Sequence, residues 1–164
     1  MRKPLVVFTP KKPLRMKESH SSIDELTRGS FEEVLDDPGV TDPDAVRRLV
    51  FCSGKVAWDA LGARDARQVS AAIIRVEQLF PFPQEQLLEV LSRYPNAKEL
   101  VWLQEEPENM GAWRYMFHHT HPIEDRGYAV RPVARVESGS PATGSATIHE
   151  QELADLLDET FADL

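Results

Sequence analysis

The strongest constraint on the fold is a regular alternation of apolar runs with amphipathic segments from residue 47 to residue 164. The apolar runs, at residues 47–52, 71–76, 100–104 and 128–133, are rich in β-branched and aromatic residues, as buried strands are. Residues 55–68, a segment opened by Pro83, residues 111–121 and residues 148–164 carry apolar side chains at helical spacing. This alternation predicts an α/β domain, with a parallel or mostly parallel sheet of about five strands and helices on both faces.

The first 45 residues have a different character. Residues 9–17 are basic and interrupted by prolines, which favours an extended segment. Ser22, followed three residues later by Glu25, predicts a capped helix start, and residues 36–44 contain two turn sequences. We therefore predict an N-terminal extended segment with a short helix at residues 1–45, packing on the domain or its neighbours. An α/β domain follows at residues 46–164, and Pro132 predicts that its last strand lies at a sheet edge.

Composition narrows the possible functions. A formal net charge of −8 over 164 residues argues against nucleic acid as a partner, because phosphate binding relies on clustered Lys and Arg. No apolar stretch approaches the length of a membrane span or a signal-peptide core, so we expect no membrane partner and a cytoplasmic location. The single cysteine, Cys52, lies in an apolar run, and this predicts a buried thiol in a reducing compartment.

One candidate binding segment follows the first apolar run. In sheets of this kind, ligands bind beyond the carboxyl ends of the strands, where the strand order reverses. Ser53-Gly54-Lys55 lies at such an end, and the start of the next helix together with a lysine could bind an anion. The alternative is that Ser53 caps the helix and Gly54 permits close helix–sheet packing. The segment lacks the full glycine spacing of a phosphate loop or a dinucleotide fingerprint.

A second candidate segment ends the third apolar run. Gln104, Glu105 and Glu106 follow one another there, and paired carboxylates can act as general acid and base. Neighbouring residues on a strand point to opposite faces, however, so Glu105 and Glu106 are not expected to meet at one substrate. The alternative is that one of them pairs with an arginine at a domain interface.

A third candidate is a histidine cluster. His118 and His121 have the three-residue spacing of metal ligands on one helix, and His119 lies between them. No cysteine or further histidine is near them in sequence. Partly buried or interface histidines are therefore the alternative to a metal site or a general base.

The same segments, in the same order, resemble the C-terminal domain of the first component of 2-oxoglutarate dehydrogenase. The strings that carry the resemblance are PLVVFTPK at 4–11 with LR at 14–15, RRLVFCSGKV at 47–56, RVEQLFPFP at 75–83, RYPNA at 93–97, VWLQEEP at 101–107, GAW at 111–113, SPATG at 140–144 and His149. Each string is modest alone, but together they follow the family order over nearly the whole chain.

The resemblance implies a transketolase-like domain that packs against the catalytic domains of its own enzyme and across a homodimer. It also implies that the full enzyme uses thiamine diphosphate and magnesium to decarboxylate 2-oxoglutarate, and passes the succinyl group to a lipoyl-bearing succinyltransferase. In this family the two cofactors bind to earlier domains through a Gly-Asp-Gly motif, which this sequence lacks. We therefore expect no cofactor, metal or catalytic residue in this chain, and no activity of the chain alone.

Some members of the resembled family respond to nucleotides such as acetyl-CoA or AMP, bound near the domain junction. The residues of this chain that the resemblance offers for such contacts are Lys11, Arg15, Ser53, Gly54 and Lys55. A different class of function remains open beside it, namely a free-standing α/β module that binds a nucleotide or another anion.

The resemblance gives a structural role to the second candidate segment. Residues expected at an interface or fixing a loop are Gln104, Glu105, Glu106, Gly111 and Trp113. The chain also departs from the family before the SPATG string, where many members have further arginines and this sequence has Glu137. Its negative charge makes an anion site at that loop less favourable.

Overall fold

The computed structural model describes residues 2–4 and 6–164, and the chain divides into two compact units, residues 1–31 and 32–164. In the first unit, 3-10 helices at Pro13–Arg15 and Lys17–Ser19 precede the helix α1 (Ile23–Arg28). The predicted cap of α1 is confirmed, because Ser22 Oγ accepts from the Glu25 N–H at 3.1 Å and the Glu25 carboxylate accepts from the Ser22 N–H at 2.6 Å. None of the described residues of this unit is buried.

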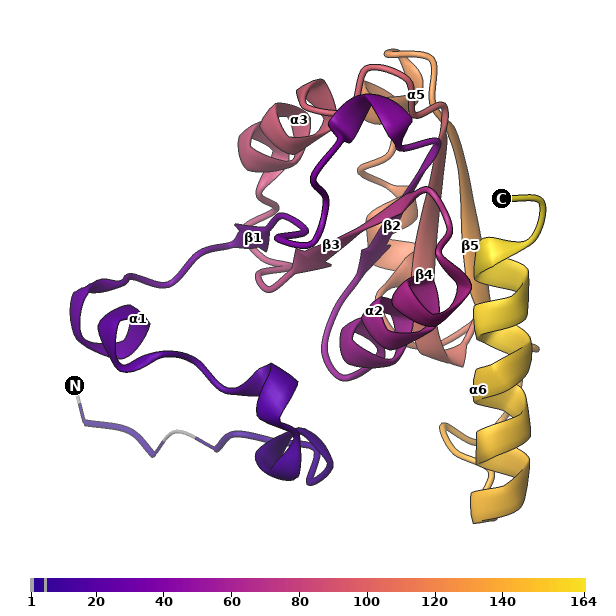
Figure 1. Cartoon of the computed structure of the whole chain (residues 1–164). Helices are drawn as coiled ribbons and strands as arrows, with labels where there is room; N and C mark the ends of the chain where they lie inside the picture. Colours follow the sequence, from indigo (N-terminus) through magenta and orange to yellow (C-terminus); the bar gives the residue numbers. More distant parts are fainter. Residues whose placement is uncertain (1, 5) are drawn as a thin grey trace. The chain divides into compact units, whose positions relative to one another are not determined.

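The second unit is built on a five-stranded sheet in the order β1-β3-β2-β4-β5 (Figure 1). The strands are β1 (Val34–Leu35), β2 (Arg48–Cys52), β3 (Ala71–Val76), β4 (Glu99–Pro107) and β5 (Ala129–Arg135). β1 pairs with β3 in the antiparallel sense, and the other three pairings are parallel. The predicted α/β class with a mostly parallel sheet is confirmed, as is the edge position of the strand that contains Pro132.

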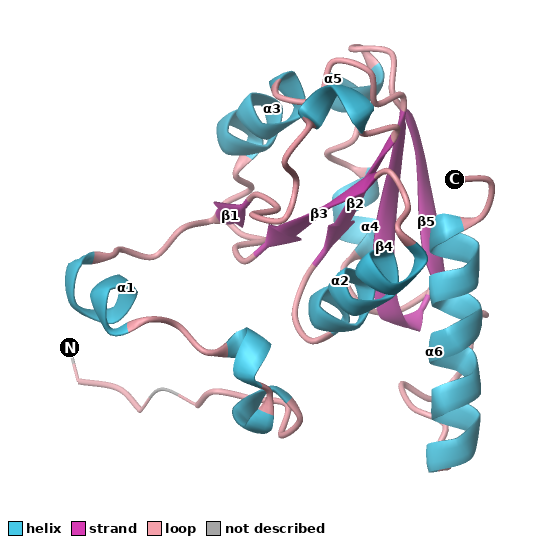
Figure 2. Cartoon of the chain, viewed as in Figure 1, coloured by secondary structure: helices cyan, strands magenta, loops and turns pink. Residues whose placement is uncertain are grey.

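Helices cover both faces of this sheet (Figure 2). Helices α2 (Val56–Arg67) and α6 (Ala146–Phe161) pack on one face, and α3 (Gln84–Ser92), α4 (Trp113–Phe117) and α5 (His121–Glu124) pack on the other. Successive side chains alternate between these layers, so Phe51 and Trp102 face α3 and α4 while Val50 and Val101 face α2 and α6. Because both faces are covered, the central strands read in the sequence as unbroken apolar runs.

One predicted helix is wrong. Residues 111–121 form two short helices, because α4 ends at Phe117 and α5 begins at His121. Thr120 ends the first helix by turning both its N–H and its hydroxyl back to the Phe117 carbonyl, at 3.3 and 2.9 Å. The strand β1 was not expected from the sequence, and β4 runs three residues beyond the predicted end. Within residues 2–4 and 6–164, no helix is long and apolar enough to cross a membrane.

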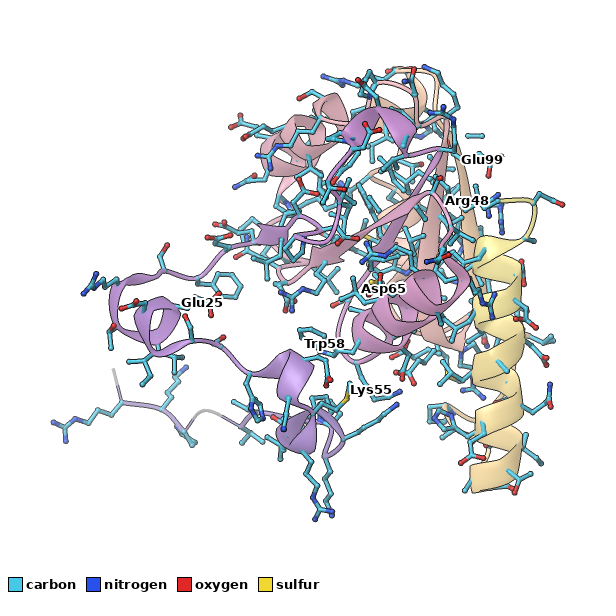
Figure 3. The ribbon with its side chains drawn as sticks, in the orientation of Figure 1. Glu25, Arg48, Lys55, Trp58, Asp65 and Glu99 are labelled. Carbon is cyan, nitrogen blue, oxygen red and sulfur yellow. The ribbon has the colours of Figure 1, made fainter. Side chains whose placement is uncertain are left out.

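A buried arginine joins the start of the sheet to the end of the chain. Arg48 opens β2 and forms an ion pair with Glu99, the first residue of β4, at 2.7 Å. Its guanidinium also donates to the carbonyls of Thr160 and Ala162, at 2.7 and 2.8 Å. Figure 3 shows Arg48 and Glu99 together at the amino ends of the strands. The end of α6 is therefore held by hydrogen bonds to a cation, which also suits the negative end of the helix dipole.

A second buried charge holds the edge of the sheet beside β1. Asp37 follows β1, and its carboxylate accepts from the Ile73 N–H of β3 at 2.8 Å and forms an ion pair with Arg64 of α2. The other carboxylate oxygen accepts from the Gly39 N–H at 2.9 Å, which closes the turn after β1. The segment before β2 thus belongs to the packed structure of the second unit. The predicted domain boundary at residue 45 is an interpretation of composition and stays a prediction.

Candidate functional site

The strand order reverses between β2 and β4, because β3 lies on one side of β2 and β4 lies on the other. At the carboxyl ends of these two strands there is a cleft of about 450 Å³. Ser53 and Gly54 from the end of β2 line it, together with Glu106 from β4, Phe80 from the loop after β3 and Tyr115 from α4. This is the position at which open α/β sheets bind ligands, and the first two candidate segments meet there.

The backbone geometry of the turn between β2 and α2 explains why it contains a glycine. Gly54 has a φ of +76°, which glycine adopts without strain, and a Cβ at this position would meet no atom within 4 Å. Lys55 occupies the N-cap position of α2, and no side chain caps that helix. The alternative interpretation of a Ser53 cap with close packing at Gly54 is therefore wrong. Ser53 is half-buried at the rim of the cleft.

Lys55 is enclosed by carboxylates of its own chain. Its Nζ lies 2.9 Å from Asp59 Oδ2, one turn along α2, and 2.5 Å from Glu105 Oε1 of β4. Partial burial acts to lower the pKa of Lys55, but the hydrogen bonds with Glu105 and Asp59 outweigh it, so the pKa is raised. The lysine is thus a firmly charged ammonium whose field is offset by two carboxylates. An added anion at this turn would meet little net positive charge.

Glu105 and Arg135 extend the same network to the last strand and the last helix. His149 Nε2 of α6 lies 4.0 Å from Glu105 Oε1. Arg135, at the end of β5, donates to the Glu105 carbonyl at 2.6 Å and pairs with Glu152 of α6 at 3.2 Å. It also donates to the Pro141 carbonyl at 2.5 Å, which fixes the loop before α6. These contacts cross-link β4, β5 and α6 at the carboxyl edge of the sheet.

Gln104 faces the opposite layer and organises the loop after β4. Its side-chain oxygen accepts from Trp102 Nε1 at 3.0 Å and from the Trp113 N–H at 2.9 Å. Its side-chain nitrogen donates to the Pro107 and Met110 carbonyls, at 3.0 and 2.9 Å. The amide is buried and joins the strand, the loop and the start of α4. One glutamine therefore makes the main polar contacts of this loop.

Gly111 completes this arrangement. Its φ is +66°, and a Cβ there would lie 3.0 Å from both polar atoms of the Gln104 amide. The structure thus brings Gln104, Gly111 and Trp113 together. Glu105 points to the ion-pair network and Glu106 is exposed at the mouth of the cleft, so the two carboxylates have different surroundings.

The three histidines do not form a common site. His118 follows α4 and His121 opens α5, so the spacing argument for a metal pair on one helix fails. His119 stacks on Phe82 with ring centroids 4.2 Å apart, and His121 Nδ1 lies 3.3 Å from Glu124 Oε2. Among the residues that the structure describes, no group of three or more His, Cys, Asp or Glu side chains could hold a metal ion.

The remaining sequence candidates are not in the cleft. Lys11 and Arg15 belong to the first unit, where both side chains are exposed. Cys52 is buried, as expected, and donates weakly to the Ile74 carbonyl with Sγ 3.9 Å from the oxygen. Burial is the main cause that raises the pKa of the Cys52 thiol to about 12, and this leaves it protonated near neutral pH.

Several residues of the network were missed from the sequence. Asp59 was detectable, since it lies four residues after Lys55 on a predicted helix.

A second cleft, of about 610 Å³, lies between the end of β5 and α6. Its charged lining is one arginine among four carboxylates: Arg135, Glu137, Glu152, Asp155 and Glu159. The sequence analysis anticipated only the charge of Glu137, because the other carboxylates come from α6, a separate element of the fold. The lining as a whole disfavours anions.

The fold and the cross-linked carboxyl edge define a doubly wound α/β domain in which the residues at the usual ligand position mainly bind one another. The chain belongs to the family described as 2-oxoglutarate dehydrogenase C-terminal, which matches residues 20–161. It is similar to the 2-oxoglutarate dehydrogenase E1 components of Azotobacter vinelandii, at 43% identity over 98% of the chain, and Cupriavidus necator, at 40% over 99%. The chain spans only 18% and 17% of the length of these relatives.

Proposed function

We propose that this chain serves as the C-terminal domain of the first component of a 2-oxoglutarate dehydrogenase. Together with the other domains of that component it would take part in the decarboxylation of 2-oxoglutarate and the succinylation of lipoyl groups. The observation that carries the proposal is the similarity to E1 components over 98–99% of the chain, at 40–43% identity.

The contacts at the carboxyl edge favour a structural role within that enzyme. Lys55, Glu105 and Arg135 are engaged with one another and with backbone carbonyls, and Gln104 is engaged with its own loop. Side chains held in this way stabilise a surface and are poorly placed to exchange protons with a substrate. We propose that the domain supplies a shaped surface for assembly, and that the chain alone has no 2-oxoglutarate dehydrogenase activity.

Thiamine diphosphate and magnesium supply the decarboxylation chemistry in the resembled family. We propose that the residues of this chain do not form a site for them. The described residues form no metal-binding cluster, and the sequence has no Gly-Asp-Gly motif. We assign no step of the reaction to residues of this chain, and propose that both cofactors bind to other domains.

Complementation tests this proposal. The purified chain is added to the Azotobacter vinelandii E1 component from which the region aligned with this chain has been removed, with thiamine diphosphate, magnesium and an artificial electron acceptor. We expect 2-oxoglutarate-dependent turnover to appear on addition of the chain and to saturate with its concentration. A folded chain that restores no turnover at any concentration would count against the proposal.

A homodimeric assembly, contact with a lipoyl-bearing succinyltransferase and a cytoplasmic location belong to the same proposal. The single free cysteine, which is buried, is consistent with a reducing compartment. Sedimentation of the complemented enzyme tests the first of these. A complex that contains one copy of each polypeptide, and not two, would contradict the homodimer.

The competing function is a free-standing α/β module that binds a nucleotide or another anion through the turn Ser53–Lys55. In its favour is the 450 Å³ cleft at the reversal of strand order, which Ser53 and Gly54 line. Against it are the two carboxylates on Lys55. Thermal unfolding with acetyl-CoA, AMP and ATP tests it, with the Lys55→Met variant as the comparison. A stabilisation that persists in that variant would exclude Lys55 as the anion contact.

A further inference from the structure

The cleft of about 610 Å³ between the last strand and the last helix has apolar surface at its base and side, where α6 packs along β5 (Figure 1). We call it the β5–α6 cleft. Its volume falls within the range of about 300–1,000 Å³ that is usual for ligand pockets. Leu156 lies deepest, at 5% exposed, whereas Val136 is 88% exposed. The apolar lining residues are Ala134, Val136, Ala142 and Leu156.

The carboxylates around this apolar surface retain capacity for a further cation. The side chains of Glu137 and Glu159 are 62% and 58% exposed. Arg114 lies 3.6 Å from the first, and Arg131 lies 3.4 Å from the second. Exposed ion pairs at such distances contribute little to stability, and a carboxylate has lone pairs for several donors. A lysine or arginine of a partner can therefore bind here without breaking a strong contact.

Helix α6 extends the acidic character along one wall of the cleft. Residues 146–161 contain five Asp and Glu and no Lys or Arg. Residues 32–164 as a whole contain twelve Lys and Arg and twenty-four Asp and Glu, a formal charge of −12. A charge of one sign draws partners of the opposite sign, and complementary charges also select among those partners. The partner that suits this cleft is thus basic.

The loop that forms the facing wall is fixed by contacts within the chain. Asn109 donates to the Ser138 carbonyl at 3.0 Å and accepts from the Ser138 N–H at 3.2 Å. Arg135 holds the Pro141 carbonyl at 2.5 Å. A wall that is ordered before binding reduces the entropy that docking costs. The β5–α6 cleft is therefore suited to receive side chains of a partner without rearrangement of its loop.

We propose that the β5–α6 cleft is a docking surface for a segment of another polypeptide that carries both basic and apolar residues. An apolar side chain of that segment packs on Val136 and Leu156, and flanking lysines or arginines pair with Glu137 and Glu159. An apolar anchor enclosed by polar contacts is the usual arrangement of a strong binding interface. The charge of the cleft selects this occupant over a neutral or acidic segment. The partner is distinct from the domains of the enzyme to which the chain belongs.

Fluorescence anisotropy with the full chain tests this docking surface. One labelled probe is a short peptide that alternates lysine and leucine, and the other alternates lysine and serine. Glu137→Gln with Glu159→Gln removes two charges from the lining of the cleft. Glu85→Gln with Glu150→Gln is the matched control, because it removes two charges at exposed positions outside that lining. Val136→Ser alters the apolar part of the lining alone.

We expect the lysine–leucine peptide to bind the unaltered chain, and Glu137→Gln with Glu159→Gln to weaken this binding by at least about tenfold. The control variant should bind within about threefold of the unaltered chain. Val136→Ser should weaken binding by at least about fivefold, as should the exchange of leucine for serine in the peptide. Binding should also weaken as salt is raised from about 0.05 to 0.5 M, because exposed opposite charges are screened.

Equal losses in the two double variants would overturn the inference, because the peptide then responds to net charge and not to the cleft. No binding by the unaltered chain would overturn it too, as would equal binding of the two peptides, since the ligand is then a simple cation. A dimer of the unaltered chain in sedimentation that Glu137→Gln with Glu159→Gln dissociates would identify a second copy as the occupant, against the inference. If the chain complements the truncated E1 component, loss of peptide binding by the complemented enzyme would show that its own domains cover the cleft, and would equally reject the inference.

Discussion

Replacement of Gln104 by leucine tests the role of this side chain in the loop after β4. The substitution keeps a side chain of similar size and removes both polar atoms. It leaves the indole N–H of Trp102 and the backbone N–H of Trp113 without their acceptor, and both groups are buried. A buried donor left without a partner costs about 1–3 kcal/mol. The two donors together therefore predict a loss of about 2–6 kcal/mol before the loop relaxes.

Relaxation reduces this figure. The Met110 carbonyl is only partly buried and can bind water, and leucine itself favours the buried position. We expect Gln104→Leu to lower the free energy of unfolding by about 3 kcal/mol, out of a total of about 5–15 kcal/mol for a typical domain. With a urea m-value of about 2 kcal/mol/M, the midpoint falls by about 1.5 M.

Urea unfolding followed by tryptophan fluorescence measures this loss. The matched control is Gln151→Leu, because Gln151 is exposed on α6, where its amide donates to the Asp155 carboxylate. The control should change the free energy of unfolding by less than about 0.5 kcal/mol. A loss below 1 kcal/mol in Gln104→Leu, at an unchanged m-value, would refute the idea that this amide holds the loop. So would equal losses in the two variants.

Three further predictions concern other residues of the second unit. Gly111→Ala should lose at least about 1 kcal/mol more stability in urea than Gly127→Ala, because both glycines have positive φ but only the first Cβ would press on Gln104; equal losses would contradict this. Arg48→Met should cost about 2–3 kcal/mol and speed amide exchange in the last turn of α6, whereas unchanged exchange there would show that the arginine does not hold the helix. The Cys52 thiol has a pKa of about 12 when folded and about 8.5 when unfolded, so folding retains a proton in this window. Stability should therefore fall as pH rises from about 8.5 towards 12, and Cys52→Ala should flatten the fall; identical urea midpoints against pH in both proteins would contradict this.

The sequence predicts the core of the fold because burial on both faces leaves a continuous apolar signal. All four predicted strands occur, and three of them, β2, β3 and β4, are apolar runs that helices cover on both sides, whereas β5 is a half-buried edge strand. The strand β1 escapes prediction because Val34 and Leu35 are only two residues, and because β1 is held in place by the buried carboxylate of Asp37. That carboxylate acts over a separation of 36 residues to Ile73, which no local pattern reveals.

The sequence predicts which residues lie at the candidate site better than it predicts which of them contact one another. Residues at the carboxyl ends of strands can be named from the sequence, and Ser53, Lys55 and Glu105 do lie there. The pairing of Lys55 with Glu105 depends on β2 and β4 being neighbours, which is a property of strand order and not of the sequence pattern. The helix across residues 111–121 fails for a local reason, because Thr120 hydrogen-bonds to the preceding turn and competes with helix continuation.

The hydrogen bonds of Arg48 have a consequence for how the polypeptide folds during translation. One of the carbonyls that satisfy the Arg48 guanidinium belongs to Thr160, which is synthesised 112 positions later. At a synthesis rate of about 5–20 residues per second, about 6–22 s pass between the synthesis of Arg48 and that of Thr160. During this interval one layer of the sheet lacks α6, and its apolar face is open to chaperones and to other nascent chains. The domain therefore completes its fold only after α6 has been synthesised, and a chain interrupted within α6 would be prone to aggregation.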